Sequence, residues 1–106
     1  MTETEFLQRA EQVMGAIEHA IEATGADIDF SRSGNVLALE LGDGSKVVVN
    51  SQAPMQQMWV AGRTGAFHYA WQDGAWIDTR DGSELLAALS RLLSAQGGEP
   101  VVLGPG

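Results

Sequence analysis

Residues 27–78 form short segments in which apolar and polar side chains largely alternate, and this pattern constrains the fold more than any other feature. The segments read DIDF, VLALEL, KVVVN, MQQMWVA, AFHYAW and AWID. Turns of about three to five residues separate them, whereas a crossover between parallel strands needs a dozen or more residues. The sequence therefore predicts an antiparallel meander of about five or six strands.

An amphipathic helix is predicted on each side of this region. Residues 3–23 repeat apolar side chains at spacings of three and four, Thr2 and Glu5 match a capping box, and Gly25 suits the helix end. Residues 81–95 show the same periodicity, with Ser83 as the candidate N-cap. The two apolar stripes consist of Phe6, Ala10, Val13, Met14, Ile17 and Ile21, and of Leu85, Leu86, Leu89, Leu92 and Leu93.

One face of the predicted sheet offers large apolar side chains for both helices to cover. These are Leu37, Leu39, Leu41, Val47, Val49, Met58, Val60, Phe67, Tyr69 and Trp71. We therefore predict an α/β (α+β) two-layer sandwich, with two helices packed on one face of an antiparallel sheet and the other face open to solvent. The chain is expected to form a single domain over 1–106, with a core of about 3–96 and an irregular Gly- and Pro-rich tail over 97–106, from which Val101, Val102 and Leu103 can still pack between elements.

The composition excludes several classes of function. Fourteen acidic and six basic residues give a formal net charge of −8, which argues against binding nucleic acid or anionic lipid and favours cations and basic protein surfaces as partners. No apolar run approaches the ~18 residues of a membrane span. The chain has no cysteine, so disulfides, thiolate metal sites and cysteine catalysis are excluded and a cytoplasmic location is expected.

Sequence motifs of enzymes are absent. The chain has no phosphate-binding Gly-rich loop, no HExxH and no EF-hand spacing. No Ser, Cys or paired acid is expected near His68 to make it a general base. The protein is therefore not expected to be an enzyme.

Carboxylates gather on the first helix beside its apolar stripe. At 100° per residue, Glu11, Glu18 and Glu22 fall within an arc of about 40°. Asp27 and Asp29 flank Ile28 on the first strand and are expected to point the same way. Such solvated carboxylates form a weak site for Fe²⁺, Fe³⁺, Mn²⁺ or Ca²⁺. A plain solvated helix face explains them equally well, and His19, further round the helix, reads more readily as a surface residue than as a ligand.

Trp59 is predicted to lie on the open face of the sheet. Strict alternation places it with Gln57, opposite to the buried Met58 and Val60. With Asn50 and other amides nearby, the indole could anchor an interface with a partner, because tryptophan is enriched at the energetic centres of interfaces. It could also cover a gap beneath a loop. Alternation places His68 on the same face of a neighbouring strand, where it could join the same surface or simply face solvent.

The segment NSQAPMQQMWVA resembles a motif of the bacterial frataxins, the CyaY family. The family pattern Asn-x-Gln-x-Pro-x-x-Gln-x-Trp-x-Ala matches the residues Asn50, Gln52, Pro54, Gln57, Trp59 and Ala61. Further matches are EFLQRAEQVMGAIE, DIDFSRSGNVLALELGDGSKVVVN, GAFHYAW and WIDTRDGSELLAAL, in order from about residue 3 to 96.

The resemblance implies a frataxin-like fold and a role in iron–sulfur cluster assembly. It implies weak binding of iron, Fe²⁺ or Fe³⁺, at an acidic ridge made of Glu11, Glu18, Glu22, Asp27 and Asp29. It also implies contacts with the cysteine desulfurase, whose activity the protein would modulate, and with the iron–sulfur cluster scaffold protein. The contact with this machinery would use Trp59 with Asn50 and Gln57, and His68 is a candidate for the same surface.

The sequence departs from the family pattern at the end of the first helix. HAIEATGADID has fewer acids there than bacterial relatives often carry, which brings His19 into consideration as a ligand. Two alternatives use the same residues: a ferroxidase or iron-storage protein built on the ridge, and an acidic domain with no metal role. A monomer is expected, because the chain shows no further large apolar stripe.

Overall fold

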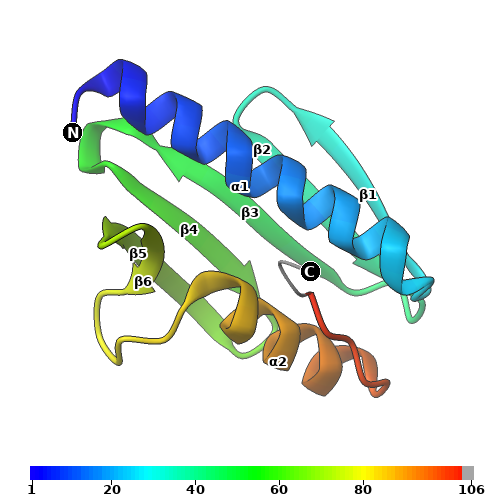
Figure 1. The fold of residues 1–106 in the computed structure, drawn as a ribbon. Coiled ribbons are helices and arrows are strands. Elements are labelled where there is room, and N and C mark those ends of the chain that lie inside the picture. The colour runs from blue at the N-terminus through cyan, green and yellow to red at the C-terminus, as the bar shows by residue number, and fades with distance from the viewer. Residues whose placement is uncertain (104–106) are drawn as a thin grey trace.

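The computed structural model describes residues 1–103, and its two helices cover one face of a six-stranded sheet (Figure 1). The elements in chain order are α1 (Glu3–Thr24), β1 (Ile28–Ser33), β2 (Val36–Leu41), β3 (Lys46–Gln52), the 3₁₀ turn η1 (Ala53–Met55), β4 (Gln57–Gly62), β5 (Gly65–Gln72), β6 (Ala75–Asp78) and α2 (Leu85–Gly97). Within 1–103, neither helix is long and apolar enough to cross a membrane.

The sheet is an antiparallel meander, as predicted. The strands lie in the order β1-β2-β3-β4-β5-β6, so each strand pairs with its neighbour along the chain. Side chains alternate between the two faces of a strand, and residues paired across strands point to the same face. The register therefore arranges the side chains in rows that run across the sheet on each face. The fold class predicted from the sequence is therefore confirmed.

The core lies between the helices and the sheet. Every residue predicted in the α1 stripe is buried, as are Leu85, Leu89 and Leu93 of α2. Of the ten side chains predicted on the covered sheet face, Phe67 and Trp71 are only half-buried and the others are buried. Trp76, which the sequence analysis left out of the core, is 3% exposed and packs edge-on against Phe6 and Trp71. Arg9 of α1 places its guanidinium 4.9 Å from the centre of the Trp71 ring.

The first turn of α1 is fixed by the predicted capping box. The Thr2 hydroxyl accepts a hydrogen bond from the Glu5 backbone N–H at 3.1 Å, and the Glu5 carboxylate accepts one from the Thr2 N–H at 3.1 Å. The second bond lowers the pKa of Glu5, so its contribution to stability is present above the ordinary carboxylate pKa and is lost as the pH falls through the lowered value.

Replacing Thr2 by alanine is expected to lower the free energy of unfolding by about 1 kcal/mol, because the first turn loses the acceptor for one of its free N–H groups. Thr4→Ala is the matched control, since Thr4 is exposed inside the helix and caps nothing. Urea unfolding measures both variants. Equal stabilities for the two would contradict the capping role of Thr2.

The N-cap of helix α2 lies one residue later than the N-cap predicted from the sequence. Its N-cap is Glu84, whose carboxylate accepts hydrogen bonds from the N–H groups of Leu86 and Ala87. Ser83 cannot act as the N-cap because its carbonyl accepts the Asp78 N–H, while Glu84 bridges to Ile77 of β6. The strand pairing therefore keeps the chain extended up to Glu84.

The chain after α2 turns back and lies between the two helices (Figure 1). Val101 and Leu103 are buried, at 6% and 2% exposure, whereas Val102 between them is 74% exposed. The Val101 N–H donates to the Ser94 hydroxyl and the Leu103 N–H to the Ser90 hydroxyl, at 2.8 and 2.9 Å. The tail predicted to be irregular is thus without helix or strand but is part of the core up to Leu103. Its last residues, 104–106, lie outside the described range.

Candidate functional site

The open face of the sheet brings together the four side chains predicted to contact a partner. Asn50 of β3, Trp59 of β4 and His68 of β5 are direct neighbours across the strands. The Trp59 and His68 rings stack at 4.4 Å between centroids and 12° between planes. The Trp59 Nε1–H donates to the Gln57 side-chain oxygen at 2.9 Å. We call these four residues the sheet patch.

The stacking decides how much of the indole is available to a partner. His68 covers one face of the indole, and Asn50 borders it on the other side at cross-strand distance. The next row of the register holds Ser31, Ala38, Val48, Ala61 and Ala66, all small or medium-sized. All four side chains of the sheet patch are half-buried. The patch therefore presents the edge of a stacked aromatic pair, in which the indole N–H is already bonded, beside a surface of smaller side chains.

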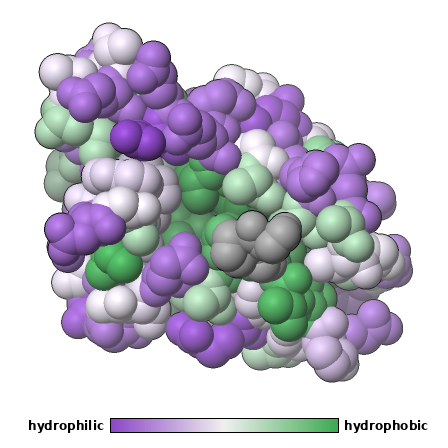
Figure 2. Space-filling model, in the orientation of Figure 1, coloured by the Kyte–Doolittle hydropathy of each residue, from purple (hydrophilic) through white to green (hydrophobic). Residues whose placement is uncertain are grey.

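The acidic side chains of α1 lie on the opposite layer of the sandwich. Hydrophilic side chains run along the outward side of α1, and hydrophobic ones show in the seam between the helices (Figure 2). Glu11, His19 and Glu22 are exposed, and Glu18 is half-buried. The helix thus places the predicted acids on the surface, where water can solvate them.

Arg32 of β1 pairs with two of the ridge carboxylates. Its guanidinium donates to Glu11 at 2.5 Å and to Glu18 at 3.3 Å. Hydrogen bonding to Glu11 is the main reason why the pKa of Arg32 is raised above its ordinary value, and the bond to Glu18 acts in the same direction. Side-chain exposure is 22% for Arg32 and for Glu18 but 70% for Glu11. A metal ion at this end of the ridge must therefore compete with a resident cation.

The sequence analysis missed Arg32, although its position carried a signal. Ile28, Phe30 and Arg32 alternate along β1 and are all half-buried, because they share the face covered by α1. A basic residue that points from β1 toward the acidic side of α1 can reach those acids. Alternation together with charge could have identified the pair.

The structure does not bring Asp27 and Asp29 together. The Asp27 carboxylate lies against Gly42, where an added Cβ would be only 2.5 Å from one of its oxygens. Asp29 lies on the open face, opposite Glu40, which in turn pairs with Lys46. Residue 27 stands in a bend before β1 begins, with the Ile28 N–H bonded to the Ala26 carbonyl, so strand alternation does not extend to it.

The ridge contains no preformed metal cage among residues 1–103. No three side chains of His, Asp or Glu in this range converge closely enough to hold a metal ion together. A cation at the ridge would be held by one or two carboxylates and by water, as expected for a weak site with oxygen ligands. The ridge can therefore attract cations and basic surfaces through its summed charge.

The chain matches the frataxin-like domain family over residues 1–99. A protein of Paraburkholderia phymatum named iron-sulfur cluster assembly protein CyaY is 50% identical over 105 residues, which cover 99% of this chain and 100% of that protein. A protein of the same name from Janthinobacterium sp. is 53% identical over 108 residues, covering 97% and 96% of the two chains.

Solved frataxin structures show the same fold. The frataxin of Psychromonas ingrahamii superposes with a TM-score of 0.92 at 38% identity, covering 98% of this chain and 99% of that one. A trimeric yeast frataxin complexed with ferrous iron gives a TM-score of 0.68 at 23% identity, covering 93% and 88%, and this match supports the fold alone. The family match and the full-length relatives establish that the chain belongs to the frataxin-like (CyaY) family.

Proposed function

We propose that the protein acts in iron–sulfur cluster assembly as a non-catalytic, iron-binding modulator of the cysteine desulfurase and its scaffold protein. The observation that carries this proposal is that relatives about 50% identical over nearly the whole chain are named iron–sulfur cluster assembly proteins. The proposal places the protein in the cytoplasm as a monomer.

Two separate surfaces support this role. The acidic ridge would bind iron weakly and dock onto a basic surface of the desulfurase, because its carboxylates other than Glu18 are exposed and the chain carries a net charge of −8. The sheet patch would contact the scaffold protein through the rim of the Trp59–His68 pair. Because the two surfaces lie on different layers of the sandwich, one molecule could engage both partners at once.

Charge on the ridge is expected to control binding to the desulfurase. The double variant Glu18→Gln/Glu22→Gln should raise the Kd at low salt by roughly fivefold, from the loss of about 1 kcal/mol of charge interaction. The matched control Asp73→Asn/Asp81→Asn makes the same change in net charge away from the ridge, at two exposed positions. The measurement is a binding titration with purified cysteine desulfurase at low and high salt.

The difference between these two variants should shrink at high salt, because ions screen exposed charges. Equal weakening by both variants would mean that net charge alone matters and would contradict docking through the ridge. The same proteins test the alternative activity: iron-dependent oxygen consumption that disappears only in the ridge variant would support a ferroxidase instead.

Arg32 is expected to hold down the affinity of the ridge for metal ions. Arg32→Gln frees Glu11 and Glu18 and should lower the Kd for Mn²⁺ by roughly two- to fivefold, since each released ion pair is worth about 0.2–1 kcal/mol. Arg63→Gln is the control, because Arg63 pairs with Asp43 outside the ridge. Titration followed by amide NMR would show the effect as shifts within residues 11–29, and equal affinities for the two variants would contradict it.

A further inference from the structure

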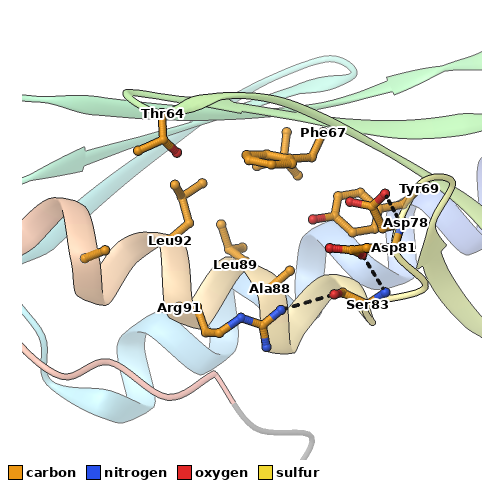
Figure 3. A pocket seen from close by; sticks show the side chains of 12 residues that line it. Thr64, Phe67, Tyr69, Asp78, Asp81, Ser83, Ala88, Leu89, Arg91 and Leu92 are labelled. Carbon is orange, nitrogen blue, oxygen red and sulfur yellow. Dashed lines mark hydrogen bonds between the residues drawn. The ribbon is translucent and has the colours of Figure 1, made fainter.

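A cavity of about 280 Å³ lies between α2 and the β4–β6 side of the sheet, away from both surfaces described above (Figure 3). Two features of the neighbouring elements account for this cavity. Strand β6 ends at Asp78 and leaves the first residues of β5, from Gly65 onward, without a partner on that side. Helix α2 presents the small side chains of Ala88 and Ala95 to the space beneath.

The walls of the cavity are mostly apolar. Val60, Phe67, Leu89 and Leu92 line it, and Figure 3 shows the Phe67 ring and the two leucines facing the same space from sheet and helix. An apolar cavity of about 150 Å³ in another protein is large enough to bind benzene. The volume here therefore accommodates a ring of that size together with a short polar substituent.

Tyr69 directs an unused hydroxyl into this space. The residue is 2% exposed, its hydroxyl makes no hydrogen bond within residues 1–103, and the hydroxyl oxygen is not sealed from solvent, so it can be reached through the cavity. Figure 3 shows the hydroxyl pointing away from β6 and toward the cavity. The hydroxyl can donate one hydrogen bond and accept others, so it is free to bond to water or to a guest in the cavity.

Asp78 is a second buried polar group on the same wall. It is 6% exposed and is the cross-strand neighbour of Tyr69. One carboxylate oxygen, Oδ1, accepts the N–H groups of Arg80 and Asp81 at 2.7 and 3.3 Å. The other oxygen accepts no hydrogen bond from residues 1–103, and no basic side chain in that range lies within ion-pair distance of it. The carboxylate is thus held by two backbone N–H groups, and its second oxygen is open to solvent, where it can accept a charge-assisted hydrogen bond from a cationic ligand.

The two arginines nearby contact groups other than Asp78. Arg91 at the cavity mouth is exposed and donates to the Ser83 hydroxyl at 3.3 Å. Arg80 donates to the Ala66 carbonyl at 3.0 Å and lies 6.0 Å from the centre of the Phe67 ring, on the free edge of β5. Neither one forms an ion pair with Asp78, and with Asp78, Asp81 and Arg91 in its lining the cavity carries more negative than positive charge.

From these contacts we propose that the cavity binds a small organic ammonium ion, a compact aromatic or branched aliphatic body with a primary amine. The apolar body packs against Phe67 and Leu92. The ammonium donates to the free oxygen of Asp78 and to the Tyr69 hydroxyl. No part of the proposed role in cluster assembly uses these residues.

Benzylamine is a suitable probe because it joins one ring to one ammonium group. Titration of the full-length, ¹⁵N-labelled protein should shift the amides of Phe67, Tyr69 and Leu92, with a Kd on the order of 1 mM, as expected for so small a ligand. Benzyl alcohol, which has the same shape without charge, and benzoate, which has the opposite charge, should each bind at least tenfold more weakly.

Three variants identify the groups responsible. Asp78→Asn should weaken benzylamine binding about tenfold, whereas Asp73→Asn makes the same charge change at an exposed position outside the cavity and should have little effect. Tyr69→Phe should weaken binding several-fold while keeping the ring. Ala88→Leu should abolish binding by filling the cavity, and Ala23→Leu on the exposed side of α1 is its control.

Several outcomes would overturn the proposal. The absence of cavity shifts at 20 mM benzylamine would mean that the cavity holds only water. Benzoate binding as tightly as benzylamine would contradict selection by Asp78. Unchanged binding in both Tyr69→Phe and Ala88→Leu would place the ligand elsewhere, and these two variants decide the matter even if Asp78→Asn fails to fold.

Discussion

Replacing Leu103 by alanine is expected to lower the free energy of unfolding by about 2–4 kcal/mol, the range for removing a buried leucine side chain. Leu103 is 2% exposed and is the last described residue of the tail that lies between the helices. Its backbone N–H also donates to the Ser90 hydroxyl, which fixes the tail on α2. The measurement is urea unfolding, read as a lower midpoint at constant slope.

Val102→Ala provides the matched control for this prediction. Val102 is the adjacent residue but is 74% exposed, so its truncation should change stability by less than about 0.5 kcal/mol. Similar losses of stability in the two variants would mean that burial of the Leu103 side chain is not what stabilises the protein. No loss in either would show that the tail does not pack in solution as it does in the structure.

Trp59→Ala is expected to weaken the complex with the scaffold protein by at least about tenfold, or roughly 1.4 kcal/mol, as for an aromatic anchor at an interface. The stability of the variant should fall by less than about 1 kcal/mol, because Trp59 is half-buried and lies on the open face rather than in the core. Calorimetric titration with purified scaffold protein gives the Kd, and urea unfolding gives the stability.

Ile77→Ala serves as the control for the indole. Ile77 is half-buried and lies on the same open face, on the edge strand β6. Scaffold binding that is lost equally in both variants would point to a general effect of the face and not to the sheet patch. A Trp59→Ala protein that unfolds would contradict the placement of the indole outside the core.

The sheet could be predicted from the sequence because short turns and alternation leave few choices. Turns of this length allow only antiparallel neighbours, and alternation then assigns Met58 and Val60 to the core and Trp59 to the open face. Alternation also predicted that His68 lies on the open face with Trp59, and the two residues are cross-strand neighbours. Stacking of the two rings could not be predicted, because it depends on side-chain rotamers and not on register.

The parts that could not be predicted depend on contacts between distant segments. Alternation at Asp27 fails because the chain bends before β1 begins, which only the contact with Gly42 reveals. The N-cap of α2 shifts to Glu84 because β6 uses the backbone of Ser83. Arg32 reaches Glu11 and Glu18 across 21 and 14 residues of chain; alternation along β1 indicates the face of its side chain, but which acids it meets depends on how α1 lies over the strand.

The agreement between strand order and chain order has a consequence for how the chain folds. Every ladder closes over a short loop, which costs little chain entropy, and folding slows as contacting residues lie further apart in sequence. The sheet can grow one hairpin at a time from any of its turns. The contacts that join opposite ends of the chain, between α1, α2 and the segment ending at Leu103, are therefore expected to form last and to limit the rate.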